Sequence, residues 1–135
     1  MTMYHLIPLL LILSAMGCSE PVGTVSGTVT LDGKPLPTGR VVFHPEDRRF
    51  APAFALLDVD GHYELKRAKG KRGAAPGKYR VSIQRAVKEG DPKFQVLARE
   101  FPIPETYGNE ESTPLIAEVL AGENTINFDV PKRRQ

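Results

Sequence analysis

The feature that most constrains this chain is a set of short segments in which apolar and polar residues alternate. The clearest is 78–85, KYRVSIQR, where Tyr79, Val81 and Ile83 are separated by polar residues. A period of two places one set of side chains on one face of a strand, and so predicts a half-buried β-strand. After the first residues, no i, i+3, i+4, i+7 pattern lasts long enough for a helix of ordinary length. The chain is therefore predicted to be all-β.

Several segments of this kind are predicted to be short strands. Their bounds are 24–31, 40–45, 53–59, 62–65, 78–85, 115–119 and 125–130, and the last two are expected to form a hairpin. Turn signals such as Asp32-Gly33 separate them, since glycine supplies the positive φ of a tight turn. The remaining stretches are interpreted as connections at 66–77, 88–93 and 102–114, and as a strand or a packed loop at 94–101. About seven regularly spaced strands without helices predict a Greek-key β-sandwich.

The predicted core follows from the parity of the alternating strands. On each strand one set of side chains must face the opposite sheet, and the apolar set is assigned to that face. The residues so assigned are Val25, Val29, Phe43, Tyr79, Val81, Ile83, Ile126 and Phe128. A chain of 135 residues that begins with a leader has room for one domain of ordinary size.

The N-terminal segment is predicted to be an export signal. Residues 6–13 read LIPLLLIL, an apolar block of the length expected in a signal peptide and too short to cross a bilayer as a helix. The run SAMGC, which ends at Cys18, resembles the lipobox of bacterial lipoproteins. The resemblance implies that Cys18 is acylated and anchors the mature chain to a membrane. The alternative is that Cys18 is an ordinary residue beside a cleavage site of the soluble type.

These assignments divide the chain into four parts. Residues 1–17 are the signal peptide, 18–23 a tether, 24–131 the β-sandwich domain and 132–135 a basic tail. The formal net charge is +2 with acidic and basic residues interspersed, which argues against nucleic acid as a partner. The tail sequence Lys132-Arg133-Arg134 is expected to be solvated rather than bound to anionic lipid or polymer.

A series of motifs along the domain resembles carboxypeptidase regulatory-like domains. They are a V-x-G-x-V strand at 25–29, a D-G-x-P-L turn at 32–36, a V-x-F strand at 41–43, a D-x-D-G-x-Y turn at 58–63 and a P-G-x-Y-x-V strand entry at 76–81. The resemblance implies a transthyretin-like (prealbumin-type) sandwich, as in small bacterial lipoproteins that consist of a leader and this one domain. Such domains are generally non-catalytic and act as stabilising, adhesive or glycan-contacting modules.

The sequence favours a binding or structural role over catalysis. It contains no G-x-S-x-G, H-E-x-x-H, P-loop or G-x-G-x-x-G motif, so neither enzyme activity nor a cofactor is expected. We expect an exported protein, held by lipid on the periplasmic or outer cell surface, that serves as a structural or protein-interaction module of the envelope. A carbohydrate-binding module is the alternative, with Tyr107 and Phe50 as aromatic platforms for a sugar.

Two groups of residues have the chemistry of metal ligands. Asp58, Asp60 and Glu64 surround a glycine turn, as calcium ligands do, but turn formation accounts for the same residues and is the favoured interpretation. His44 and His62 would need a third ligand to hold zinc, and none lies near them in the sequence. No metal is therefore predicted, and calcium stays a minor hypothesis.

Overall fold

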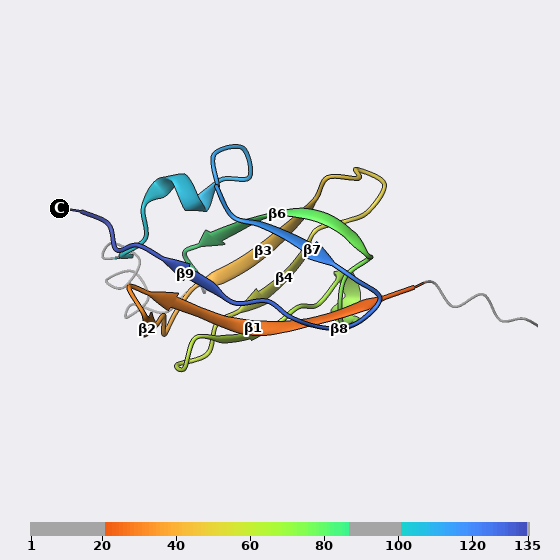
Figure 1. The fold of residues 1–135 in the computed structure, drawn as a ribbon, viewed down its shortest axis with the longest axis horizontal. Helices are drawn as coiled ribbons and strands as arrows, with labels where there is room; N and C mark the ends of the chain where they lie inside the picture. The colour runs from red at the N-terminus through yellow and green to blue at the C-terminus, as the bar shows by residue number, and fades with distance from the viewer. Residues whose placement is uncertain (1–20, 87–100, 135) are drawn as a thin grey trace, which may run out of the picture.

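The computed structural model describes residues 21–86 and 101–134, which form an all-β sandwich of two sheets (Figure 1). The first sheet contains β1 (Gly23–Leu31), β2 (Lys34–Pro35), β5 (His62–Glu64), β8 (Gly122–Thr125) and β9 (Phe128–Val130). The second sheet contains β3 (Arg40–Pro45), β4 (Ala53–Leu56), β6 (Gly77–Gln84) and β7 (Ile116–Val119). The predicted fold class, an all-β sandwich, is confirmed.

The second sheet follows the alternation of the sequence closely. Its order is β4-β3-β6-β7, and every pair in it is antiparallel. The central pair, β3 and β6, runs in register from Arg40 opposite Gln84 to Pro45 opposite Tyr79. These two strands have the strongest β-branched and aromatic patterns in the chain, which explains why the sequence located them to within a residue.

The first sheet is built around β1, the longest strand. On one side β1 pairs antiparallel with β2 and β5, and on the other it pairs parallel with β8 and β9. The predicted hairpin of 115–119 with 125–130 is therefore wrong, because β7 belongs to the second sheet and the chain then crosses to the first. A period of two shows which face of a strand is buried, but it does not specify the neighbouring strand.

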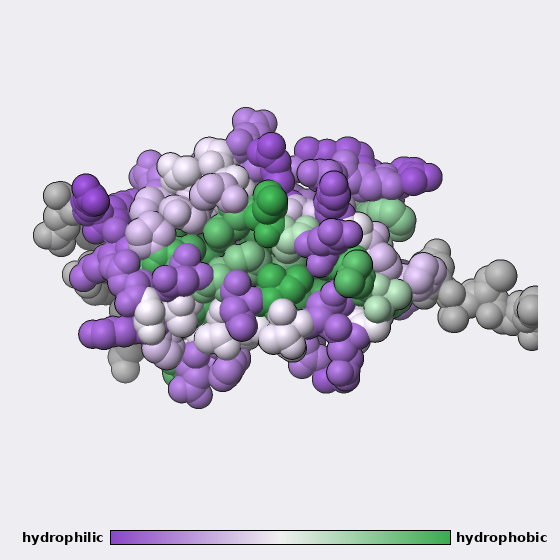
Figure 2. All heavy atoms as spheres, viewed as in Figure 1, coloured by the Kyte–Doolittle hydropathy of each residue, from purple (hydrophilic) through white to green (hydrophobic). Residues whose placement is uncertain are grey.

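The core lies between the two sheets and centres on one aromatic cluster. The ring of Phe43 lies 6.3 Å from Tyr63, 5.8 Å from Tyr79 and 6.0 Å from Phe128, centroid to centroid. All the predicted core residues are buried except Ile126, which is partly buried against them. Figure 2 shows apolar residues in the middle of the face seen there, framed by hydrophilic ones.

The connection 102–114 is a packed part of the domain. It contains the short 3-10 helix η2 (Glu105–Gly108), and the Thr113 hydroxyl donates to the Val81 carbonyl at 2.6 Å. Arg80 donates to the carbonyls of Glu110 and Glu111 at 3.4 and 3.2 Å. The connection therefore packs along β6 of the second sheet.

Parts of the predicted organisation lie outside the described residues. They are the leader 1–17, Cys18, the turn at 88–93 and most of 94–101, of which Phe101 is described and buried. In 66–77 the structure contains a second short 3-10 helix, η1 (Ala68–Gly70). Within 21–86 and 101–134, no helix is long and apolar enough to cross a membrane.

Candidate functional site

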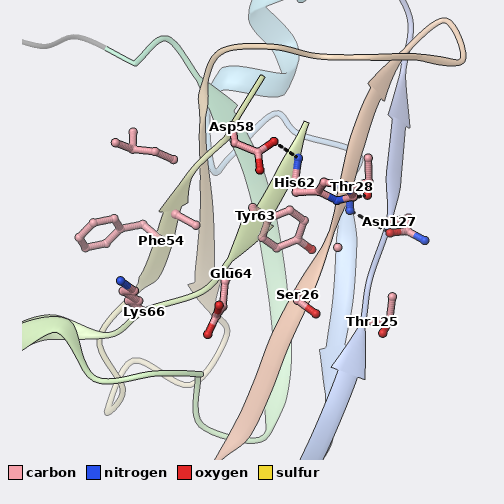
Figure 3. Close-up of a pocket in the computed structure, with 13 residues that line it drawn as sticks. Ser26, Thr28, Phe54, Asp58, His62, Tyr63, Glu64, Lys66, Thr125 and Asn127 are labelled. Atoms are coloured by element: carbon pink, nitrogen blue, oxygen red, sulfur yellow. Dashed lines mark hydrogen bonds between the residues drawn. The ribbon is translucent and has the colours of Figure 1, made fainter. Parts of the chain in front are cut away.

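A groove of about 890 Å³ lies where β4 and β5 separate (Figure 3). Phe54 and Lys66 lie on one side of it, and Thr28, His62 and Asn127 on the other. Leu56 of β4 also lines the groove. Since β4 belongs to the second sheet and β5 to the first, the groove lies at the seam of the sandwich.

The groove opens in the middle of a hairpin that is bonded at both ends. Phe54 and Lys66 exchange two backbone hydrogen bonds of 3.0 Å, and the Asp58 amide donates to the His62 carbonyl at 3.0 Å. Leu56 and Glu64 stand opposite each other between these two points. Among the described residues, no backbone hydrogen bond joins this pair.

The two arms separate because each is held by a different sheet. The Leu57 amide donates to the Gly39 carbonyl, and the Leu65 amide to the Val25 carbonyl, at 2.9 Å in both cases. Phe54 directs its backbone groups to Lys66, so Leu56, two residues on, directs its own toward the groove. The open segment is therefore a short piece of unpaired strand edge.

The side chains on β4 are distributed in an unusual way. Ala53 and Ala55 face the core, whereas the larger Phe54 and Leu56 are 40% and 57% exposed. The guanidinium of Arg40 lies 4.5 Å above the Phe54 ring and covers part of it. Apolar residues exposed on an edge strand are a recurrent feature of binding surfaces.

The wall formed by the first sheet is polar and hydrogen-bonded. The Thr28 hydroxyl and His62 Nδ1 are 2.8 Å apart, and the Thr28 amide donates to Asn127 Oδ1 at 2.9 Å. Burial raises the pKa of the Tyr63 phenol, which keeps its proton and donates to the Ile126 carbonyl at 2.5 Å. The bonds of Asn127 and Tyr63 connect the segment between β8 and β9 to β1 and β5.

Comparisons with known proteins leave the family of this chain open. No family model matches the chain, and no curated protein matches it significantly. A solved structure, a DUF3823 family protein from Parabacteroides merdae ATCC 43184, aligns with a TM-score of 0.47 and 18% sequence identity. The alignment covers 83% of this chain and 47% of that one, so this chain spans about half the length of that protein.

Two of the three residues of the calcium hypothesis, Asp58 and Glu64, have side chains engaged in other contacts. Asp58 Oδ1 accepts the amides of Asp60 and His62 at 2.8 and 3.0 Å, as in an Asx turn. Glu64 pairs with Arg72 at 2.6 Å. Among the described residues, no group of three or more metal-ligating side chains could hold an ion.

The two histidines considered for zinc lie in different sheets. His62 contacts Thr28 on the first sheet, whereas His44 Nε2 lies 2.8 Å from the Ser82 hydroxyl on the second. Desolvation lowers the pKa of His44, an effect that the nearby Glu110 carboxylate opposes. Both rings are therefore accounted for by hydrogen bonds within their own sheets.

The two aromatic residues considered for sugar binding are not brought together. Phe50 lies in the β3–β4 loop and is 45% exposed, whereas Tyr107 lies in η2 and packs partly buried against the core. Figure 1 shows that loop and η2 at different ends of the second sheet. The two rings therefore do not form a shared platform for a sugar.

Sequence reasoning missed the exposed pair Phe54 and Leu56. The segment was recognised as a strand, but its two faces were not assigned. Its order of small and large residues, Ala-Phe-Ala-Leu, carries the signal. Small residues at one parity suit the close-packed core beneath an edge strand, and the larger ones then point outward.

Proposed function

We propose that this protein is a lipid-anchored, non-catalytic module of the bacterial cell envelope that binds an extended segment of a partner protein along the open part of the β4–β5 hairpin. The observation that carries the proposal is the unpaired strand edge at Leu56, flanked by exposed apolar side chains. Addition of a strand to such an edge supplies backbone hydrogen bonds, and adjacent side chains supply specificity. The resemblance to carboxypeptidase regulatory-like domains and the lipobox-like run before Cys18 support the same role.

The hydrogen bonds in the groove also favour binding over catalysis. His62 is the natural candidate for a general base, and its Nδ1 faces the Thr28 hydroxyl. A carboxylate would have to orient the ring, yet Asp58 contacts the backbone amide of His62 instead. A threonine beside a histidine without that third group lacks the arrangement of an activated nucleophile.

The interaction is tested by placing a photoreactive side chain at position 56 of the full-length protein in its native host. The matched control carries the same group at Ile116, which is 75% exposed on β7, the opposite edge of the second sheet. We expect one defined crosslinked partner from position 56 and none from position 116. Equal labelling from both positions, or none from either, would contradict the proposed edge.

The substitution Leu56→Lys gives a second test. A lysine on an edge strand opposes strand addition, while a change at an exposed position alters the free energy of unfolding by only about 0.5 kcal/mol. We therefore expect the partner to be lost from a protein that unfolds as the wild type does, with Ile116→Lys as the control that keeps it. Retention of the partner by Leu56→Lys would move the binding site elsewhere.

The anchor is tested separately by mass spectrometry of the protein from native membranes. We expect an N-terminal acylated Cys18. A mature chain that begins elsewhere, or that carries an unmodified cysteine, would exclude the lipid anchor. The crosslinking and Leu56→Lys experiments would still test the binding groove.

A further inference from the structure

A second hollow, of about 470 Å³, lies at the end of the sandwich where the chain enters the fold. Pro21, the first described residue, lines it together with Phe50 and the basic residues Arg49, Arg67, Lys69 and Lys71. Within the part of the chain that the structure describes, no acidic side chain lines it. The hollow combines cations and an exposed aromatic ring beside the attachment point of the tether.

Most of these cations come from one short segment. Residues 66–72 read KRAKGKR, with five basic side chains and no acidic one. The backbone folds into a tight turn at this point, with positive φ angles at Lys69 and Gly70 and a hydrogen bond from the Arg67 amide to the Lys71 carbonyl at 2.6 Å. Because of this turn, the side chains of Arg67, Lys69 and Lys71 line the same hollow.

The cations of the hollow and the neighbouring Arg72, which does not line it, differ in whether the fold supplies a counter-charge. Arg49 is paired with Asp47 at 2.7 Å and Arg72 with Glu64 at 2.6 Å. Among the described residues, no ion pair involves Arg67, Lys69 or Lys71, and the buried Arg67 Nε has no hydrogen-bond partner there. The hollow therefore presents a net positive surface on which Arg67, Lys69 and Lys71 form no ion pair within the described residues.

We infer that this basic end is a membrane-docking surface that binds the phosphate groups of anionic phospholipids, and that it fixes the orientation of the domain on the bilayer. The inference rests on the proposed lipid anchor. Cys18 precedes Pro21 by three residues, which span at most roughly 11 Å when fully extended. That reach is close to the Debye length of about 10 Å at 0.1 M salt, so an acylated Cys18 would hold the cations within range of the headgroup charges.

The presence of Phe50 favours a bilayer over a soluble polyanion. Its ring is 45% exposed beside Arg49, and its hydrophobic surface has no role in binding a phosphate ion or a charged polymer. At a membrane, cations contact the headgroups while an aromatic side chain enters the boundary with the acyl chains. Docking at this end leaves the β4–β5 groove, along the side of the sandwich, open to a partner.

The test uses the full-length acylated protein in vesicles, with a fluorophore on Ala68→Cys in η1 or on Lys34→Cys in β2 at the opposite end. Quenching by spin-labelled lipid headgroups reports contact with the bilayer. In vesicles of phosphatidylcholine with phosphatidylglycerol, we expect quenching at 68 to exceed that at 34 several-fold. The difference should disappear in high salt and in phosphatidylcholine alone, because screening or loss of the anionic lipid removes the attraction.

Charge variants show whether the cations of the hollow are responsible. Each cation near an anionic surface changes the docking equilibrium about fivefold, so Lys69→Gln with Lys71→Gln should weaken docking about 25-fold. The control pair Lys132→Gln and Arg134→Gln removes the same charge from the C-terminal tail and should leave docking unchanged. Equal quenching at positions 68 and 34 would overturn the inference. So would a control pair that weakens docking as much as Lys69→Gln with Lys71→Gln does.

A failure of the anchor is distinguishable from a failure of the docking surface. If mass spectrometry finds Cys18 unmodified, sedimentation of that unmodified full-length chain with the same vesicles still measures the basic end. Salt-sensitive binding that Lys69→Gln and Lys71→Gln abolish would retain the docking surface without the anchor. No binding to either kind of vesicle, or binding to a soluble polyanion alone, would exclude a membrane role for this end.

Discussion

The chain passes from the second sheet to the first at β4–β5 and again at β7–β8, and the two crossings are closed differently. At β7–β8 the side chain of Asn124 accepts the Leu120 amide at 3.0 Å and donates to the carbonyls of Leu120 and Thr24 at 2.8 and 3.1 Å. At β4–β5 the arms are bonded only at their ends and remain apart around Leu56. A sheet-to-sheet crossing can thus be closed by one amide side chain, so the opening at β4–β5 is a property of that hairpin and not of the topology.

The largest expected effect concerns β1, the strand with which both β5 and β8 pair after the two crossings. A Cβ on Gly27 of β1 would overlap the Ile126 carbonyl oxygen, which belongs to the backbone and cannot swing aside as a side chain can. We expect Gly27→Ala to lower the free energy of unfolding by about 3 kcal/mol or more, because backbone must shift to relieve the clash. Urea denaturation followed by circular dichroism measures this loss.

Gly33→Ala serves as the control for that substitution. Gly33 has a φ of 80°, but apart from Gly33 itself and its two chain neighbours no described residue has a heavy atom within 4 Å of the point that a Cβ would occupy. Its alanine variant therefore carries a conformational cost of about 1 kcal/mol and no clash. A similar loss for both variants would show that the approach of Ile126 to β1 is less close than the structure indicates.

The second prediction concerns the two asparagines that follow the crossing into the first sheet. Asn124→Ala removes several hydrogen bonds at β7–β8 and should cost about 2 kcal/mol, since each contributes roughly 0.5–1.5 kcal/mol. Asn127→Ala removes one bond, to the Thr28 amide, and should cost about 1 kcal/mol. Thermal unfolding measures the loss of stability in both variants. A larger loss for Asn127→Ala than for Asn124→Ala would contradict the conclusion that Asn124 closes the β7–β8 crossing.

The sequence predicted the faces of strands well and their partners poorly. Val81 belongs to a strictly alternating run, so its burial could be inferred from period two alone, whereas Phe43 follows two valines in a short apolar run. The parallel pairing of β8 and β9 with β1 depends on residues about a hundred positions apart, and no local pattern encodes such a contact. The same reason explains why the opening at Leu56 was not predicted, because it arises from the competition of two sheets for one hairpin.

The candidate site was predictable only where local turn chemistry decides it. Asp58 and Gly61 could be assigned to a turn from sequence, and Asp58 does accept two backbone amides there. The basic turn at 66–72 was visible as composition, but its position beside Pro21 and Phe50 requires the fold. Charges that are distant in the sequence become a surface only after the strands between them have paired.

The smallest expected effect concerns calcium at the turn of the open hairpin. Asp58 Oδ1 accepts two backbone amides and Glu64 is paired with Arg72, so these carboxylates already have partners. An ion bound only to the folded state would raise the melting temperature by mass action. We expect the melting curves of the full-length protein in millimolar calcium and in chelator to superimpose.

Two variants of Asp58 separate the turn interpretation from the metal interpretation. Asp58→Asn retains an oxygen that can accept both amides, so it should change the free energy of unfolding little, whereas Asp58→Ala removes the acceptor and should cost about 1–2 kcal/mol. A calcium site would rank them differently, because loss of the negative charge in Asp58→Asn would already abolish any stabilisation by the ion. A rise of several degrees with calcium that disappears in both Asp58→Asn and Asp60→Asn would replace the turn by a metal site, and the open hairpin would then be a calcium-dependent one.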